Sequence, residues 1–586
     1  MSKRDLIVVG AALIAAALAV FALRPGPRVP EDAPSQVEMA RALGAEVMQN
    51  IYRGHVPGRS GEIYLVPRPH RYLAGDWDLN TLDSDTPWMN TTHPNPWSYL
   101  AKVPMIFYGP PYVPEGLELT RPADVASIAP SYAQLLGMDD FDAEAQPLEE
   151  VFSDRAGDPP KVVLTVVIDG GGWNVLEQHP TSHPTIDALR AAGTTYVNAT
   201  IGSAPSITGA IHATMSTGFY PRDHGLPGNQ MRDPEGAGSG GDMTIDTWLQ
   251  NGDPRYLKLP TVSELWDERN DNEAIVATVS YEGWHLGMIG HGAQRSGGDK
   301  DIGVIWDHEA DAWWTNESFY TLPDYLNPTD LATLEKYERE LDARDGLVDE
   351  TWFGKTLEEI REQPVRPGTT AFAQFTGDAV ADVLRNEDIG KDDVTDLMWV
   401  ELKPPDFGGH LWNMLGPEQA DTIRETDRQI KRFKTILDQK VGPGNYVLTV
   451  SADHGQQPLP EQFGGWRINT VELVRDIEDQ FGNGIVADSN SVELFLDLDR
   501  IEEADVDLSE IASYIGAYTV AENIPDERPG RERVPEPRLD ERLFAGAFTT
   551  DFLSSLSAED VDGFGEGDYA EGRLTDLSSG SSDEDP

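Results

Sequence analysis

Residues 162–172 read VVLTVVIDGGG, a continuous run of β-branched and apolar side chains that ends in an aspartate and three glycines. Such a run is typical of a strand buried on both faces of a parallel sheet, with Asp169 at its carboxyl end. A second stretch, NYVLTVSADHG (445–455), repeats the pattern and ends in Asp453 and His454. Because the carboxyl ends of parallel strands meet at one edge of a sheet, we expect these polar side chains to lie close together.

Helix-forming segments separate the two strands. HPTIDALRAAG (183–193) follows the first strand. Before the second strand, four apolar side chains fall on one face of a helix: Ile423, Ile430, Phe433 and Leu437. Strands that alternate with helices form a mostly parallel sheet covered by helices on both faces. The sequence therefore predicts an α/β fold whose ligands bind at the carboxyl ends of its strands.

The composition excludes several classes of function. The 586 residues include 101 Asp and Glu against 45 Lys and Arg, and the formal net charge of −56 would repel the phosphates of nucleic acid. Because the chain has no cysteine, it can form neither disulfides nor zinc–thiolate sites, and it has no thiol nucleophile. A tight metal site in this chain must therefore use histidine and carboxylate side chains.

The segment APSITGAIHATMSTGFYPRDHGLPGN (204–229) carries the most specific motif of the chain. It resembles the nucleophile region of the type I phosphodiesterase and nucleotide pyrophosphatase branch of the alkaline phosphatase superfamily. In that family a Thr is followed four residues later by a His, and then by a Thr-Gly-x-Tyr-Pro-x-x-His-Gly block. Thr208, His212 and residues 217–225 fill these places here. The resemblance implies that Thr208 is the nucleophile and that Asn229 binds the substrate phosphate.

The same resemblance implies a set of metal ligands. Asp169 matches the metal-binding Asp of the first strand, PPDFGGH (404–410) matches Pro-Asp-x-x-Gly-His, and SADHG (451–455) matches Ser-Asp-His-Gly. Two divalent ions are implied, and the ligand types favour zinc. One ion would be held by Asp169, Thr208, Asp453 and His454, and the other by Asp406, His410 and His93. Coordination would lower the pKa of the threonine hydroxyl, and the second ion would stabilise the leaving oxygen.

His93 is displaced in the sequence relative to the family. The family supplies this His after its Asp-His-Gly motif, whereas no His follows His454 here. Residues 58–138 instead resemble the family's C-terminal portion, with His93 in the ligand position, although Pro94 replaces the family's Gly. We therefore predict a circular permutation that moves this portion before the first strand. Permutation requires neighbouring ends, so residues 36–50 should lie beside those near 550.

The two ends of the chain differ from its centre in composition. Residues 6–23 form an uncharged apolar run after Lys3 and Arg4, and a helix of this length spans about 27 Å, enough to cross a bilayer. A cleaved signal peptide is the alternative, and in both cases the rest of the chain is exported. We expect a single-pass cell-membrane protein with an extracytoplasmic catalytic domain. Its expected parts are an anchor and linker at 1–35, the permuted portion at 36–138, an acidic linker at 139–160, the main domain at 161–550 and an acidic disordered tail at 551–586.

These motifs predict a metal-dependent phosphoester hydrolase that forms a phosphothreonine on Thr208. Phosphomonoesterases of the superfamily carry a Lys-x-Arg pair for the phosphate, whereas the corresponding stretch reads YEGWH (281–285) here. A phosphodiester or pyrophosphate substrate is therefore favoured. The alternatives are a phosphomonoesterase and a catalytically inert, membrane-tethered interaction protein. The expected partners are a small phosphoester and, through residues 6–23, the membrane, without nucleic acid.

Overall fold

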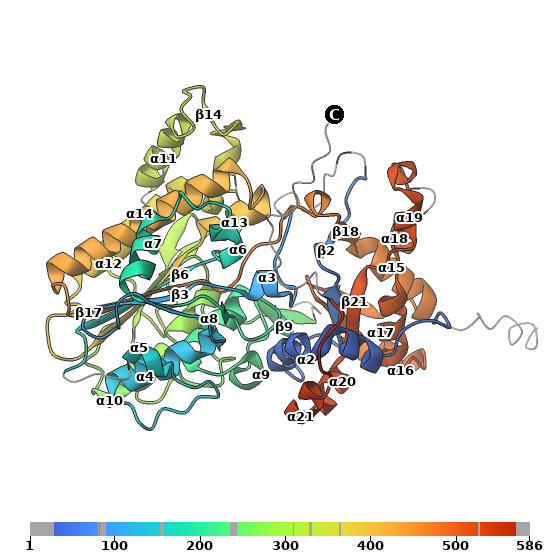
Figure 1. Ribbon diagram of the computed structural model, residues 1–586, viewed down its shortest axis with the longest axis horizontal. Coiled ribbons are helices and arrows are strands. Elements are labelled where there is room, and N and C mark those ends of the chain that lie inside the picture. The colour runs from blue at the N-terminus through green and yellow to red at the C-terminus, as the bar shows by residue number, and fades with distance from the viewer. Residues whose placement is uncertain are drawn as a thin grey trace, which may run out of the picture.

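The computed structural model describes residues 29–79, 81, 89–152, 158–234, 243–308, 310–326, 331–362, 365–525 and 528–569 (Figure 1). The predicted membrane span at 6–23 lies outside this part of the chain, as do residues 570–586 of the predicted tail. Within the described ranges, no helix has both the length and the apolar character needed to cross a membrane. The N-terminal anchor therefore stays a prediction.

The larger sheet has nine strands in the order β13-β12-β11-β16-β6-β17-β3-β7-β4. Its centre consists of five parallel strands: β12 (Ile302–Asp307), β11 (Val276–Ser280), β16 (Asp396–Leu402), β6 (Val162–Ile168) and β17 (Tyr446–Ser451). At one edge, β13 (Ala312–Trp314) pairs antiparallel with β12. Toward the other edge, β3 (Met105–Tyr108) pairs antiparallel with β17 and with β7 (Thr194–Tyr196), and β4 (Leu117–Leu119) pairs parallel with β7. The prediction of a mostly parallel sheet is confirmed.

Helices cover both faces of this sheet (Figure 1). Along β6, Leu164 and Val166 face one core and Val163 and Val167 face the other, so the strand is buried throughout. The first face is covered by α7 (Pro184–Ala192), α12 (Thr370–Asn386) and α14 (Pro417–Lys440), and the second by α4 (Ile128–Leu136), α8 (Thr208–Thr217) and α10 (Val262–Arg269). Burial on both sides explains why the strand sequence is continuously apolar.

Strands from both ends of the chain form a second sheet in the order β19-β20-β1-β21. β1 (Ile63–Pro67) lies antiparallel between β20 (Glu493–Leu496) and β21 (Phe544–Thr549), with β19 (Val486–Ser489) at the edge. Nearby, β2 (Arg71–Ala74) pairs with β18 (Trp466–Asn469), and α15 (Thr470–Phe481) and α17 (Leu508–Ala517) share a core with these strands. The N-terminal segment thus adds strands to both large sheets.

The two ends of the catalytic region lie side by side, as the permutation requires. α2 (Gln36–Gly54) packs against β21. The backbone N–H of Thr549 donates to Gln36 Oε1 at 2.7 Å, and the Thr550 hydroxyl hydrogen-bonds to His55 Nε2 at 2.9 Å. The expected proximity is confirmed, whereas the permutation itself stays a prediction.

The predicted linker and the predicted disordered tail both contain packed helices. The acidic linker includes α5 (Glu149–Phe152), where Val151 and Phe152 are buried. The predicted tail includes α20 (Thr550–Ser555) and α21 (Ala558–Asp562), where Leu553 and Val561 are buried. The prediction of disorder is therefore wrong for the helical residues of the tail. Isolated apolar side chains in acidic sequence produce no periodic pattern that could predict a helix. In the tail, Leu553 and Val561 belong to the same core as α2, and α21 packs against that helix.

A chain that ends at residue 555 should be less stable than the full chain. The residues after it bind α2 and its surroundings: Ala45 N–H donates to the Gly565 carbonyl at 2.8 Å, and the Tyr569 ring lies 5.4 Å from that of Trp97. Their loss exposes apolar surface and should lower the melting temperature by about 2–5 °C. A chain ending at residue 569 is the matched control and should melt like the full chain. Identical melting temperatures for both truncations would show that α21 adds no stability.

Candidate active site

The carboxyl ends of β6, β16 and β17 bring the predicted site residues together. Asp169 follows β6, α13 (Pro404–Leu411) follows β16 and carries Asp406 and His410, and Asp453 and His454 follow β17. His93 reaches them from the segment before α3 (Ser98–Ala101), and Thr208 is the first residue of α8. All seven side chains are buried. The fold thus collects every residue that the sequence predicts for the site's metals.

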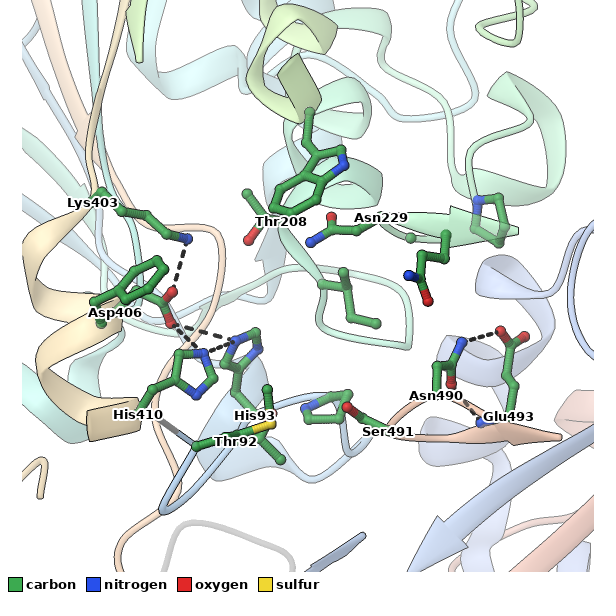
Figure 2. Close-up of a pocket in the computed structure, with 18 residues that line it drawn as sticks. Thr92, His93, Thr208, Asn229, Lys403, Asp406, His410, Asn490, Ser491 and Glu493 are labelled. Atoms are coloured by element: carbon green, nitrogen blue, oxygen red, sulfur yellow. Dashed lines mark hydrogen bonds and ion pairs between the residues drawn. The ribbon is translucent and has the colours of Figure 1, made fainter. Parts of the chain in front are cut away.

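His93, Asp406 and His410 form one cluster of ligand atoms (Figure 2). His93 Nε2 lies 3.4 Å from Asp406 Oδ1 and 3.2 Å from His410 Nε2, and His410 Nε2 lies 3.2 Å from Asp406 Oδ1. Tetrahedral bonds of 2.0–2.1 Å separate ligand atoms by about 3.3–3.4 Å, so this spacing fits one zinc-class ion. His93 Nδ1 donates to the Ser206 carbonyl, and His410 Nδ1 donates to the Thr91 carbonyl, each at 2.6 Å. These hydrogen bonds orient both rings so that their Nε2 atoms face the cluster.

The second predicted ligand cluster consists of Asp169, Asp453 and His454, and the structure also places Asp169, Asp406 and His454 within reach of one ion. His454 Nε2 lies 3.4 Å from Asp169 Oδ1 and 3.3 Å from Asp453 Oδ2. These three atoms are buried, and none has a hydrogen-bond partner in the described part of the chain. Buried polar atoms without partners are costly, and a cation bound beside His454 would supply a partner for them. The two clusters adjoin, because the rings of His93 and His454 stack with centroids 3.4 Å apart.

The surroundings of His93 and His454 lower the pKa of both imidazoles and so favour the neutral form. Burial, reinforced by His454, holds the pKa of His93 well below its ordinary value. Burial also lowers the pKa of His454, although Asp169 opposes the shift. Neutral imidazole is the form that ligates metal. Burial disfavours the charged form of His410 as well, but Asp406 outweighs it and raises its pKa, so binding at this cluster weakens as the pH falls.

Thr208 and Asn229 line the pocket beside these clusters (Figure 2). The capping residue of α8 is Ile207, so the Thr208 side chain is not a helix cap. The Gly209 N–H donates to Asn229 Oδ1 at 2.9 Å, which leaves the NH₂ group of Asn229 for another acceptor. His212 donates from Nδ1 to the Thr208 carbonyl at 2.8 Å and supports the backbone of Thr208 from within the helix. The pocket encloses about 300 Å³, and Trp284 forms part of its wall.

Three charged residues of the site were missed by the sequence analysis. Lys403 Nζ lies 2.8 Å from Asp169 Oδ2 and 2.8 Å from Asp406 Oδ2. On the other side, His285 Nε2 lies 3.4 Å from Asp169 Oδ2 and 3.6 Å from Glu401 Oε1. The sequence does contain a signal for two of them. Glu401 interrupts the apolar sequence of β16, and Lys403 follows that strand just before the Pro-Asp motif. Charged residues at the end of a buried strand point to a functional site.

The fold and the paired ligand clusters beside a buried threonine define a phosphoester hydrolase of the alkaline phosphatase superfamily. The sequence model of the family described as type I phosphodiesterase / nucleotide pyrophosphatase matches residues 163–548, more than half of the chain. The chain belongs to this family.

Curated relatives carry names of the same superfamily. Alkaline phosphatase PafA of Elizabethkingia meningoseptica is 24% identical over 405 residues, which cover 61% of this chain and 72% of that protein. Alkaline phosphatase PhoV of Synechococcus elongatus is 23% identical over 410 residues, or 62% of this chain and 72% of that protein. The crystal structure of wild-type PafA has a TM-score of 0.49 and 17% identity, over 67% of this chain and 85% of that chain.

Proposed function

We propose that this chain hydrolyses phosphoesters through a covalent phosphothreonine on Thr208. The observation that carries the proposal is that Thr208, free of a capping role, lines one pocket with Asn229 and the cluster of His93, Asp406 and His410. The Thr208 oxygen would attack phosphorus while the bond to the leaving oxygen breaks. Water would then attack the phosphothreonine and restore the hydroxyl. A complete ligand set argues against the inert alternative.

The residues of the site have distinct parts in this proposal. Two divalent ions, with zinc favoured by the ligand types, would be held by the two clusters, with Thr208 as a ligand of the Asp169 cluster, and would supply positive charge for the phosphoryl group. The NH₂ group of Asn229 would donate to a phosphoryl oxygen, because its Oδ1 is already engaged by Gly209. His285 would hold Asp169 in position from behind.

Phosphodiesters and phosphomonoesters are the two candidate substrate classes. The description of the family supports diesters, as does the stretch YEGWH (281–285), which has no Lys-x-Arg pair. Lys403 supports monoesters, because it supplies a cation to the pocket from a different segment. The names of the relatives PafA and PhoV agree with this second class.

The permuted order of the chain is also a proposal. The family match begins at residue 163 and leaves the segment 36–138 outside. That segment nevertheless contributes β1 and β3 to the two large sheets and His93 to the site. The neighbouring positions of α2 and β21 support the same order.

An acid-quench experiment on the full chain tests the proposed function. With an aryl phosphomonoester or an aryl phosphodiester as substrate, we expect turnover that EDTA abolishes, because the ligand clusters lose their ions. Mass spectrometry of the quenched protein should find the phosphoryl group on Thr208. Turnover with the phosphoryl group on another residue, or with no covalent species under single-turnover conditions, would contradict the proposal.

A further inference from the structure

Lys403 is a buried cation at the centre of the site. It follows β16 directly and is only 4% exposed. Its ammonium group contacts Asp169 Oδ2 and Asp406 Oδ2, each at 2.8 Å, and therefore joins one carboxylate from each ligand cluster. Figure 2 shows the contact with Asp406. The rings of Tyr281 and Phe407 lie 6.0 and 5.3 Å from the ammonium nitrogen and add cation–π attraction. The surroundings thus hold the ammonium group at one defined position.

Lys403 and the metal clusters use different oxygens of the two aspartates. Asp169 Oδ1 is the oxygen that lies 3.4 Å from His454 Nε2, and Asp406 Oδ1 is the one that lies 3.2 Å from His410 Nε2. The lysine therefore leaves to the metal clusters the oxygens that face their histidines. Its paired contacts with two carboxylates are those of a charged ammonium group.

One N–H of the ammonium group is left for a substrate. A lysine ammonium has three N–H donors. Within the described part of the chain, the ammonium group donates a hydrogen bond to Asp169 Oδ2 and forms an ion pair with Asp406 Oδ2. Because Lys403 lines the same pocket as Thr208 and Asn229, a phosphoryl group bound there against Thr208 meets a cation with an unused donor.

The two classes of ester differ in what they offer this donor. The phosphoryl group of a monoester has three terminal oxygens and nearly two negative charges at neutral pH. A diester replaces one of those oxygens with a second ester oxygen and carries a single charge. An additional buried cation therefore adds more to the binding of a monoester than to that of a diester.

We propose that Lys403 binds a terminal oxygen of the transferred phosphoryl group and makes phosphomonoesters the preferred substrates of this site. It supplies, from the connection between β16 and α13, the cation that residues 281–285 do not provide. The lysine gives up no proton in this role, and it stays an ammonium group throughout. The inference rests on the proposed hydrolysis at Thr208.

The substitution Lys403→Met tests the inference, because it keeps a similar side-chain length and removes the charge. We expect kcat/KM for an aryl phosphomonoester to fall by about thirtyfold or more and that for a methyl aryl phosphodiester by less than about threefold. The metal content, measured by inductively coupled plasma mass spectrometry, should stay unchanged. Lys403→Arg should recover part of the monoester activity. Lys434→Met is the matched control on α14, away from the pocket, and should alter neither activity.

Phosphate binding gives a readout independent of turnover. Calorimetry with inorganic phosphate should show at least about tenfold weaker binding to Thr208→Ala/Lys403→Met than to Thr208→Ala. Equal losses on both esters together with unchanged phosphate binding would overturn the inference. So would a higher metal content in Lys403→Met, because Lys403 would then occupy a metal position. If Lys403→Met does not fold, the folded variant Lys403→Arg takes its place in the test. Retention of the monoester preference by this variant supports the inference, and loss of the preference overturns it. A wild-type chain without phosphothreonine would instead contradict the proposed function, whatever its phosphate binding.

Discussion

Thr208→Ala should lower kcat by about 10⁴-fold or more while leaving the fold and the metal content unchanged. The substitution removes the hydroxyl and the γ-methyl group of Thr208, and the two ligand clusters keep their carboxylates and imidazoles. Because Ile207 rather than Thr208 caps α8, the loss of the hydroxyl removes no capping bond. Steady-state kinetics, metal analysis and the melting temperature of the purified variant measure the three parts of this prediction.

Thr208→Ser is the control for this substitution. It keeps a hydroxyl group at the first position of α8 and should retain measurable turnover and form a phosphoserine in the acid-quench experiment. Residual activity of Thr208→Ala above about a tenth of the wild-type value would point to a different nucleophile, since a positioned hydroxyl cannot be replaced by a methyl group.

His93→Ala should have the second largest effect, with activity lowered by about a hundredfold or more and one metal ion per chain lost. His93 Nε2 is one of the three ligand atoms in its cluster, and Asp406 with His410 alone leaves two protein ligands. Activity should return in part at high zinc concentration, because the remaining ligands still bind weakly. Metal analysis after dialysis and a zinc titration of activity measure both effects.

His55→Ala is the matched control for His93→Ala. His55 belongs to the same N-terminal segment and is also buried, but it binds the Thr550 hydroxyl rather than either cluster. We expect it to lower stability without changing the metal content. If His93→Ala keeps its full metal content and activity, the assignment of this histidine as a ligand is wrong, and with it the strongest argument for a permuted chain.

Local sequence patterns were sufficient to predict the centre of the fold. The apolar runs of β6 and β17 end in the acidic and histidine residues that the sheet then brings together. A strand that is buried on both faces has a continuously apolar sequence, and this feature does not depend on which strands lie beside it. The motif around Thr208 likewise lies within one segment, so its residues could be recognised without knowledge of the fold.

Contacts between distant segments required the tertiary structure. The place of Lys403 between Asp169 and Asp406 depends on the alignment of β16 with β6, and the sequence analysis had judged the site to lack a cation for the phosphate. His285 reaches Asp169 from the connection after β11 in the same way. No spacing within either segment encodes these distances.

The sequence by itself indicated which strands are buried, and it predicted the candidate site residues, including His93 in place of a histidine that does not follow His454. Only the tertiary structure decided that Lys403 and His285 lie within the site and that α21 packs against α2. The physical reason is that periodicity records whether a side chain is buried, whereas its partner depends on the register and packing of elements far apart in the chain.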